Sequence, residues 1–262
     1  MIDTHAHLDF PHFDTDREEV IRHAHEAGVE IIINVGADLV SSERSVALAQ
    51  THPAMYATVG VHPHDAKTWD SETAPARLEE LAAHPCVVAI GEIGLDFYRN
   101  FSPREDQKRA FADQVTVARK MNLPIVVHNR EAFPEVFEML LEHHAHDVGG
   151  VMHCFAGTVQ QAWQTIDYGF YISVGGRLTY PGSRDVAVVA ELPLEKILLE
   201  TDCPYLTPVP FRGKRNHPAL VTYVRARIAE IKGVSEEQVD AVTTASARRL
   251  FRLADETKTE KH

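Results

Sequence analysis

Residues 86–94 read CVVAIGEIG, a nearly unbroken apolar run with one carboxylate, Glu92, close to its end. Similar short apolar runs recur along the chain and alternate with amphipathic stretches. The other runs lie at 1–8, 29–36, 55–62, 123–129, 149–155, 170–176 and 196–202. Near-continuous apolar strands that alternate with helices are typical of parallel strands covered by helices on one face. Eight such units predict an α/β fold, a (β/α)8 TIM barrel.

The stretches between these runs supply the helices. Residues 16–28, 76–84, 103–122 and 132–144 are amphipathic, with Gly28 and Gly169 as expected helix ends and Thr158 as an expected helix start. Residues 235–253 predict an extra C-terminal helix packed on the barrel, followed by a polar, frayed tail at about 254–262. An open doubly wound sheet is the alternative, but no G-x-G-x-x-G follows the first run.

Length and composition favour one domain over residues 1–262, with 44% hydrophobic residues to fill a core. The net charge of −12 argues against passive coating of nucleic acid by a basic surface. Cys86, Cys154 and Cys203 form neither a disulfide framework nor a C-x-x-C zinc pattern. No apolar run has membrane-spanning length and the start lacks a signal-peptide pattern. We expect a cytoplasmic protein with no membrane contact and no obligate protein partner.

Ionisable residues stand at the ends of the predicted strands, where such barrels carry their chemistry. His5 and His7 share the first run, and side chains at i and i+2 of a strand point to one side. The full set is His5, His7, His62, Glu92, His128, His153 and Asp202. One histidine at a strand end is more often a core or turn residue than a ligand. Two buried carboxylates among imidazoles, however, need a cation, and zinc or manganese accepts both groups.

Two divalent cations that share a bridging carboxylate would use all of these groups except His62. Glu92, from the middle of the barrel, is the expected bridge. His5, His7 and Asp202 come from strands that meet when the barrel closes, so we expect them at one metal. We expect His128 and His153 at the other. Asp202 and Glu92 are the expected catalytic residues, with Asp202 orienting the attacking water or taking its proton.

The loop after the eighth run, residues 203–218, reads CPYLTPVPFRGKRNHP and concentrates positive charge in an acidic protein. Arg212, Lys214 and Arg215 are expected to contact phosphate, and the alternative is a solvated basic turn. Tyr205 either stacks a base or anchors the proline-rich loop.

Three further residues are expected near the substrate. His62, in VGVHPH, faces it or supports a ligand, and Arg130, just past His128, touches a phosphate. Asp96 is expected in a loop that closes over the site.

These motifs resemble the TatD family of metal-dependent deoxyribonucleases, within the amidohydrolase-like barrels. The resemblance covers nearly the whole chain, in DTHAHLDF, VGVHPH, AIGEIGLDFYR, LPIVVHNRE, HCFAGT, LLETDCPYLTPVPFRGKRN and ARRLF. It implies divalent-metal ligands at His5, His7, Glu92, His128, His153 and Asp202, the set reached from the strand ends. It also implies 3′→5′ exonuclease action on DNA with zinc, manganese or magnesium. One departure is visible: RGKRNHP places His217 where the family commonly has glutamate.

We therefore expect a hydrolase that cleaves phosphodiester bonds of DNA, at single strands or ends, with two divalent cations. The alternative is a D-aminoacyl-tRNA deacylase or another ester or amide hydrolase with the same ligands. A third possibility is a metal-loaded barrel that serves as a scaffold without turnover.

Overall fold

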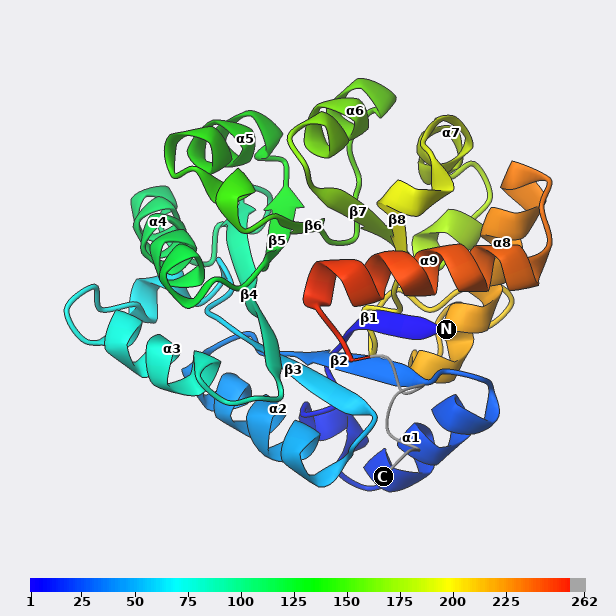
Figure 1. Cartoon of the computed structure of the whole chain (residues 1–262), viewed down its shortest axis with the longest axis horizontal. Helices are drawn as coiled ribbons and strands as arrows, with labels where there is room; N and C mark the ends of the chain where they lie inside the picture. Colours follow the sequence, from blue (N-terminus) through cyan, green and yellow to red (C-terminus); the bar gives the residue numbers. More distant parts are fainter. Residues whose placement is uncertain (255–262) are drawn as a thin grey trace.

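The computed structural model of the chain describes residues 1–254. Eight parallel strands follow one another in chain order, with helices between them (Figure 1). The strands are β1 (Ile2–Ala6), β2 (Ile31–Val35), β3 (Met55–Val59), β4 (Val87–Asp96), β5 (Ile125–Arg130), β6 (Gly150–Met152), β7 (Tyr171–Val174) and β8 (Ile197–Leu199). The helices are α1 (Arg17–Glu26), α2 (Leu39–Thr51), α3 (Ala74–Ala82), α4 (Arg104–Met121), α5 (Phe133–Glu142), α6 (Val159–Asp167), α7 (Asp185–Glu191), α8 (Val221–Lys232) and α9 (Glu236–Phe251).

This architecture confirms the predicted (β/α)8 barrel, and α9 confirms the predicted C-terminal helix. Thr158 caps α6 by accepting a hydrogen bond from the Gln161 amide. Gly28 and Gly169 follow α1 and α6 with φ of +87° and +97°, a conformation that glycine adopts without strain. The predicted polar tail, apart from Ala254, lies outside the described residues. No helix between residues 1 and 254 is long and apolar enough to cross a membrane.

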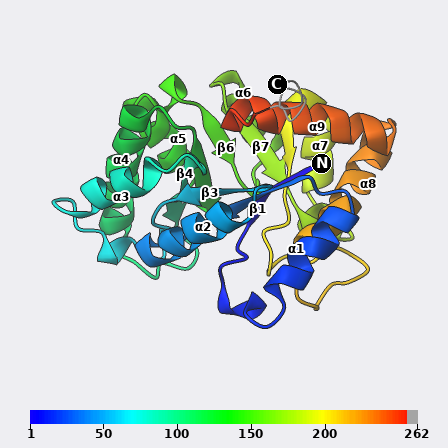
Figure 2. The ribbon, with the colours of Figure 1, turned by 60° about the horizontal axis from the view of Figure 1, so that its bottom comes forward.

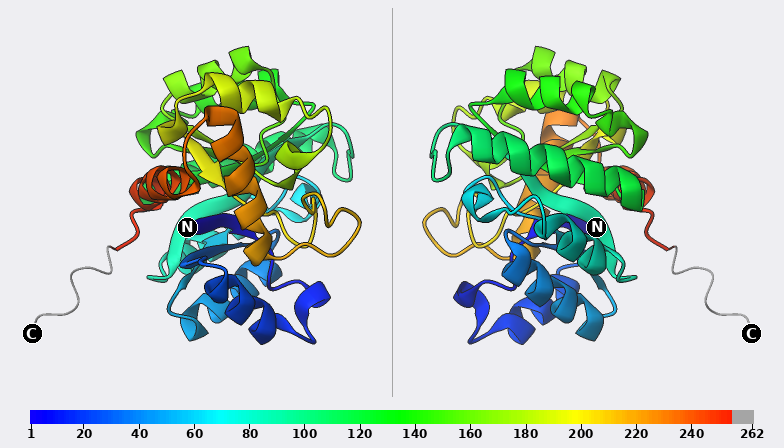
Figure 3. Two further views of the ribbon diagram at one scale, coloured as in Figure 1. Left: turned by 90° about the vertical axis from the view of Figure 1, so that its right-hand side faces the viewer. Right: turned by 90° about the vertical axis from the view of Figure 1, so that its left-hand side faces the viewer.

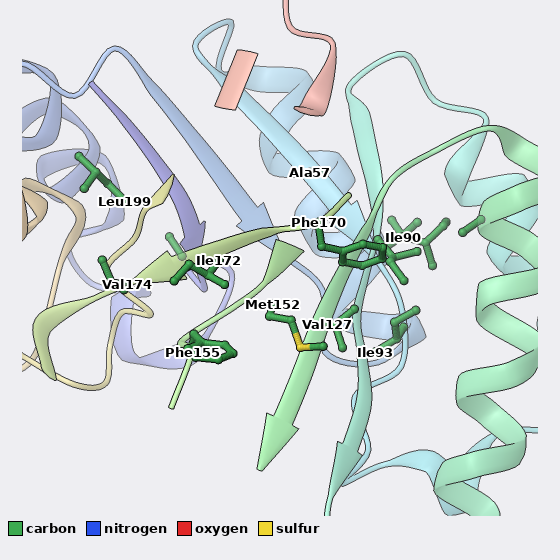
Figure 4. Packing of buried hydrophobic residues seen from close by; sticks show 14 of the residues in the cluster. Ala57, Ile90, Ile93, Val127, Met152, Phe155, Phe170, Ile172, Val174 and Leu199 are labelled. Atoms are coloured by element: carbon green, nitrogen blue, oxygen red, sulfur yellow. The ribbon is translucent and has the colours of Figure 1, made fainter. Parts of the chain in front are cut away.

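The larger apolar core lies between the strands and the surrounding helices. Ile90, Val127 and Ile172 contribute to it from three strands (Figure 4), and Phe111 of α4 belongs to the same buried cluster. Alternate residues of each strand point the other way, into the barrel. The strand residues are therefore apolar on both faces, which explains why their sequences form almost continuous apolar runs.

Helix α9 covers one end of the barrel interior, where it crosses in front of the strands in Figure 1. Its Leu250 and Phe251 belong to one buried cluster with inward-facing residues such as Ile33, Val126 and Leu198. The amino ends of the strands are thereby filled with apolar groups. The polar interior and the chemistry that it carries are confined to the carboxyl ends.

The barrel closes along a seam between β1 and β8, where an isolated bridge joins Ala6 to Cys203. Next to this bridge, the Asp3 carboxylate accepts hydrogen bonds from the Thr201 hydroxyl at 2.6 Å and from the Thr201 amide at 2.9 Å. These bonds join residues 198 positions apart in the chain. The seam places the end of β1 beside the segment that follows β8.

Candidate metal centre

The carboxyl end of the barrel gathers a histidine–carboxylate cluster. The cluster consists of His5, His7, Glu92, His128, His153 and Asp202, whose side chains are between 1% and 15% exposed. Glu92 and His128 lie within strands, whereas His153 follows β6 and Asp202 follows β8. The structure thus brings together, around one small volume, the side chains that the sequence predicted as ligands.

Glu92 lies at the centre of the cluster, and its two carboxylate oxygens face different histidines. Oε1 lies 2.7 Å from His128 Nδ1 and 2.7 Å from His153 Nε2. Oε2 lies on the other side, 3.4 Å from His5 Nε2 and 3.9 Å from His7 Nε2. Glu92 therefore contacts histidine nitrogens with both of its oxygens, while the rings of His5 and His153 stack beside it with their centres 4.0 Å apart.

Asp202 completes the side of the cluster formed by the H-x-H pair. Its Oδ1 lies 3.6 Å from His7 Nε2 and 3.8 Å from His5 Nε2. The two Nε2 atoms are themselves only 3.1 Å apart. The strand is shorter than the apolar run, since β1 ends at Ala6 and its register shifts between Asp3 and Ala6. Both imidazoles nevertheless converge on one point, as the spacing predicted.

Two glycines let β5 approach β4 closely on either side of Glu92. A Cβ atom at Gly91 would lie 2.6 Å from the Val126 Cβ, and one at Gly94 would lie 2.1 Å from the His128 carbonyl oxygen. Gly94 also has φ of +139°, which side-chain-bearing residues rarely adopt. The glycines of AIGEIGLD therefore bring Glu92 within hydrogen-bond distance of His128.

Hydrogen bonds behind the rings select the nitrogen atom that faces the cluster. His7 Nδ1 donates to the Val35 carbonyl at 2.8 Å, which leaves the lone pair on its Nε2. His128 Nε2 donates to Asp96 Oδ2 at 3.2 Å, so that Nδ1 is the ring nitrogen that faces Glu92. Such outer hydrogen bonds are typical of metal-binding histidines, because they fix the tautomer and the ring orientation.

Asp96 is not in a covering loop, and that prediction is wrong. Strand β4 continues to Asp96, because Gln107 of α4 accepts a hydrogen bond from the Asp96 amide at 2.8 Å. The carboxylate is fully buried and accepts from His64 Nε2 at 2.8 Å and from the amides of Tyr98 and Arg99. Asp96 thus supports His128 from behind rather than covering the site.

Glu200 is a buried carboxylate beside the cluster that the sequence reasoning missed. It is fully buried, accepts a hydrogen bond from the Cys154 amide at 2.7 Å, and also accepts one from the Ser173 hydroxyl. Its Oε1 lies 3.7 Å from His153 Nδ1. The sequence feature that could have identified Glu200 is its i, i+2 spacing from Asp202 in LLETD. This spacing favours two carboxylates on one face of a strand end.

Replacing Glu200 by glutamine is expected to weaken metal binding about 10- to 100-fold, the usual effect of removing an outer-shell partner. The change keeps the size of the side chain but removes the negative charge beside His153 Nδ1. Competition with a chromogenic chelator measures the affinity. Ser173→Ala is the matched control, since it removes a contact of the same carboxylate and keeps its charge. Unchanged affinity in Glu200→Gln would contradict a role behind His153.

Both carboxylates of the cluster are ionised at neutral pH. Burial raises the pKa of Glu92, but the imidazoles of His153 and His62 outweigh it and hold that pKa well below its usual value. Burial also raises the pKa of Asp202, and the neighbouring imidazoles of His7, His153 and His5 outweigh it and hold that pKa below its usual value. Two buried negative charges among imidazoles are the electrostatic setting that a cation stabilises.

Three residues that the sequence predicted to face the substrate are His62, Arg130 and Tyr205. His62 Nε2 lies 3.5 Å from Glu92 Oε1. Arg130, at the end of β5, places its guanidinium 4.1 Å from the centre of the Tyr98 ring. Tyr205 is 49% exposed on the segment after β8.

The basic loop projects beyond the barrel and passes beside α1, as Figures 2 and 3 show. Arg215 pairs there with Asp16, with an Nη1–Oδ1 distance of 3.0 Å. Arg212 lies over the Tyr180 ring and Lys214 near the Phe211 ring. Within residues 1–254 neither Arg212 nor Lys214 pairs with a carboxylate. The loop therefore offers two uncompensated charges and one that is neutralised.

His217, at the position where the sequence departs from the motif that the resemblance implies, does not anchor this loop. Anchoring is done by Asn216, whose Nδ2 donates to the carbonyls of Thr201 at 2.9 Å and Tyr205 at 2.6 Å. The substitution therefore leaves the tie between the loop and the seam in place.

The cluster fits divalent metal ions by its chemistry and its spacing. Three groups of donor atoms each lie within 4.8 Å of one another: His5, His153 and Asp202; His5, His7 and Glu92; and His62, Glu92 and His128. Imidazole nitrogen and carboxylate oxygen are the donors that zinc and manganese accept. His5 Nδ1 and His153 Nδ1 are buried and lack hydrogen-bond partners among the described residues, so the rings are not held by a complete hydrogen-bond network of their own.

The barrel and the cluster define a metal-dependent hydrolase of the (β/α)8 class. Comparison with known proteins agrees, because residues 2–252 match the family described as TatD related DNase. The chain belongs to the TatD family, and the resemblance seen in its motifs is confirmed. Members of this family are metal-dependent hydrolases that act on ester bonds.

Individual relatives match over nearly their full length. The chain is 44% identical to an uncharacterized metal-dependent hydrolase, YabD, of Bacillus subtilis, over 97% of the chain and 99% of that protein. It is 38% identical to a protein of Escherichia coli named 3′-5′ ssDNA/RNA exonuclease TatD, over 97% of the chain and 100% of that protein. The crystal structure of the TatD homologue YJJV of Escherichia coli superposes with a TM-score of 0.91 at 32% identity, covering 97% of this chain and 98% of that one.

Proposed function

We propose that this protein removes nucleotides from the 3′ end of single-stranded DNA with the help of two divalent cations. The observation that carries the proposal is the position of Glu92, whose two oxygens face different histidine nitrogens. The Escherichia coli relative is named a 3′-5′ ssDNA/RNA exonuclease, which supports the substrate and the direction of cleavage.

The cluster divides into two sets of proposed ligands that share Glu92. His5, His7 and Asp202 would hold one cation, and His128 and His153 would hold the other. Paired cations supply Lewis acidity that neutralises a phosphoryl group and makes water nucleophilic near neutral pH. The high share of imidazole favours zinc or manganese over magnesium.

Asp202 is the proposed proton acceptor for the attacking water. Its side chain is 15% exposed, so water reaches it, and its pKa lies below the usual value, so it is ionised and ready to accept a proton. A φ of +55° and the hydrogen bond from its amide to the His5 carbonyl at 2.9 Å fix its position beside the H-x-H pair.

The remaining predicted residues are proposed to bind the nucleic acid. Arg212 and Lys214 would contact phosphates, as would Arg130 and, more weakly because of Asp16, Arg215. Tyr205 would stack against a base, since half of its surface is exposed. A few local positive charges on a protein of net charge −12 favour strand ends over long duplexes.

The direct test compares substrates with and without a chelator. The purified protein is incubated with 5′-labelled single-stranded DNA, with RNA of the same sequence, and with D-aminoacyl-tRNA. We expect a ladder of DNA products shortened from the 3′ end, loss of activity on chelation, and recovery with manganese or zinc. Cleavage of D-aminoacyl-tRNA without degradation of DNA would overturn the proposal in favour of the deacylase alternative.

Replacing Lys214 by alanine is expected to weaken oligonucleotide binding at all sequences and to lower the slope of log Kd against log salt by about 0.7, the value for one contact to single strands. Lys214 is exposed and its amine pairs with no carboxylate within residues 1–254, so its loss leaves the fold intact. Fluorescence anisotropy over a salt series measures the slope. Lys196→Ala, at the other end of the barrel, is the control. An unchanged slope would remove Lys214 from the binding surface.

A further inference from the structure

His62 is the imidazole at the cluster that the proposed metal sites leave unused. Its Nε2 lies 3.5 Å from Glu92 Oε1, and its ring centre lies 4.4 Å from that of His128. The side chain is 12% exposed, so molecules from solvent reach it. Proximity alone would group His62 with Glu92 and His128 as a further set of metal ligands.

The proton on the His62 ring argues against that grouping. The backbone amide of His64 donates a hydrogen bond to His62 Nδ1 at 3.1 Å. A nitrogen that accepts a hydrogen bond carries no proton, so the neutral ring carries its proton on Nε2. The atom that faces the cluster is therefore an N–H group. His7 shows the opposite arrangement, because its Nδ1 donates to the Val35 carbonyl and its Nε2 keeps the lone pair.

The Nε2–H group of His62 is available to donate a hydrogen bond to a bound molecule. A metal needs the lone pair of a neutral imidazole, which this tautomer directs away from the cluster. No hydrogen bond to Nε2 is formed within residues 1–254, and 3.5 Å is too long for a good one to Glu92. Two hydrogen bonds fix the position of the backbone at His62. The His62 amide donates to the Ala37 carbonyl at 2.8 Å, and the Val61 amide donates to Gln114 at 2.7 Å.

We propose that His62 is not a metal ligand and that its Nε2–H donates a hydrogen bond to an anionic phosphoryl oxygen of the substrate. This inference rests on the proposed function, because it takes a phosphodiester as the incoming group. A hydrogen-bond donor that is already fixed in position stabilises the negative charge that develops on the phosphoryl group. The donor does not have to reorient during the reaction. His62 would then be a catalytic residue that touches the substrate while the cluster holds the cations.

The experiment uses His62→Ala and His62→Gln, with His84→Ala, which lies before β4 at the opposite end of the barrel, as control. Glutamine places an amide N–H close to the position of the histidine Nε2–H, whereas alanine has no donor. For each metal-loaded protein we measure metal stoichiometry and affinity, kcat/KM on single-stranded DNA, and the inhibition constant of inorganic phosphate. Nitrogen-15 NMR of the histidine-labelled wild-type protein reads the tautomer of His62.

We expect His62→Ala to bind metal like the wild type, to lose about 100-fold in kcat/KM, and to bind inorganic phosphate more weakly. His62→Gln should recover most of both losses, and the NMR spectrum should show the proton on Nε2. Loss of metal from His62→Ala would make His62 a ligand and overturn the inference. Unchanged kcat/KM and phosphate inhibition, or no recovery with glutamine, would also overturn it. If the wild type cleaves no nucleic acid, the proposed function fails, but phosphate inhibition or binding and the tautomer still decide the role of His62.

Discussion

Replacing Glu92 by alanine is expected to remove bound metal and to lower kcat/KM on single-stranded DNA by more than about 100-fold, beyond the effect of an outer-shell residue. The reason is that one side chain contacts both halves of the cluster, with its oxygens within 2.7 Å of two histidines and 3.4 Å of a third. Plasma emission spectroscopy of protein purified without chelators measures the metal, and an oligonucleotide assay measures kcat/KM.

The fold should survive this substitution, because the ladders of β4 with β3 and β5 use backbone groups. The imidazoles that surround Glu92 can remain neutral once the carboxylate is gone. The melting temperature of the metal-free protein should therefore change little. Glu105→Ala, at a position 86% exposed, is the control for the loss of one negative charge. Full metal stoichiometry in Glu92→Ala would contradict the bridging assignment.

Replacing Asp202 by asparagine is expected to lower kcat by about 10²- to 10⁴-fold, the range attributed to a positioned proton acceptor. Asparagine keeps the size of the side chain and one oxygen that faces the H-x-H pair, but it accepts no proton at neutral pH. KM should change much less than kcat, because the basic loop is untouched. Steady-state kinetics on single-stranded DNA separate the two constants.

Metal analysis of Asp202→Asn distinguishes proton transfer from simple loss of a ligand. Retained metal together with low kcat supports the proton acceptor, whereas metal lost in proportion to activity assigns Asp202 to ligation alone. Asp106→Asn, on the outer face of α4, is the matched control. Wild-type turnover in Asp202→Asn would remove the residue from catalysis altogether.

Most of the fold could be predicted from the sequence, because each strand is apolar on both faces and so appears as a continuous run. The residues at which the strands end could not be predicted. Strand β1 stops at Ala6 although the apolar pattern continues to Leu8, and β4 extends through Asp96 although the pattern turns polar. Side chains from other elements bond the backbone at both places, since the Leu8 amide donates to Asn34 and the Asp96 amide donates to Gln107.

The cluster residues could be located from the sequence because parallel strands in a barrel bring all their carboxyl ends to one side. The groups behind the cluster were harder to find. Asp96 and Glu200 act through contacts with His64, His128 and Cys154 that no local pattern encodes. The pairing of Arg215 with Asp16, across 199 residues, is invisible for the same reason.

The seam between β1 and β8 has a consequence for biosynthesis. Its bonds join Asp3 to Thr201, and the H-x-H pair and Asp202 stand on its two sides. A ribosome-bound chain that ends before residue 202 lacks the carboxylate that faces the H-x-H pair, however well its earlier units have folded. The complete cluster therefore forms only after the segment that follows β8 has been synthesised and has closed the seam.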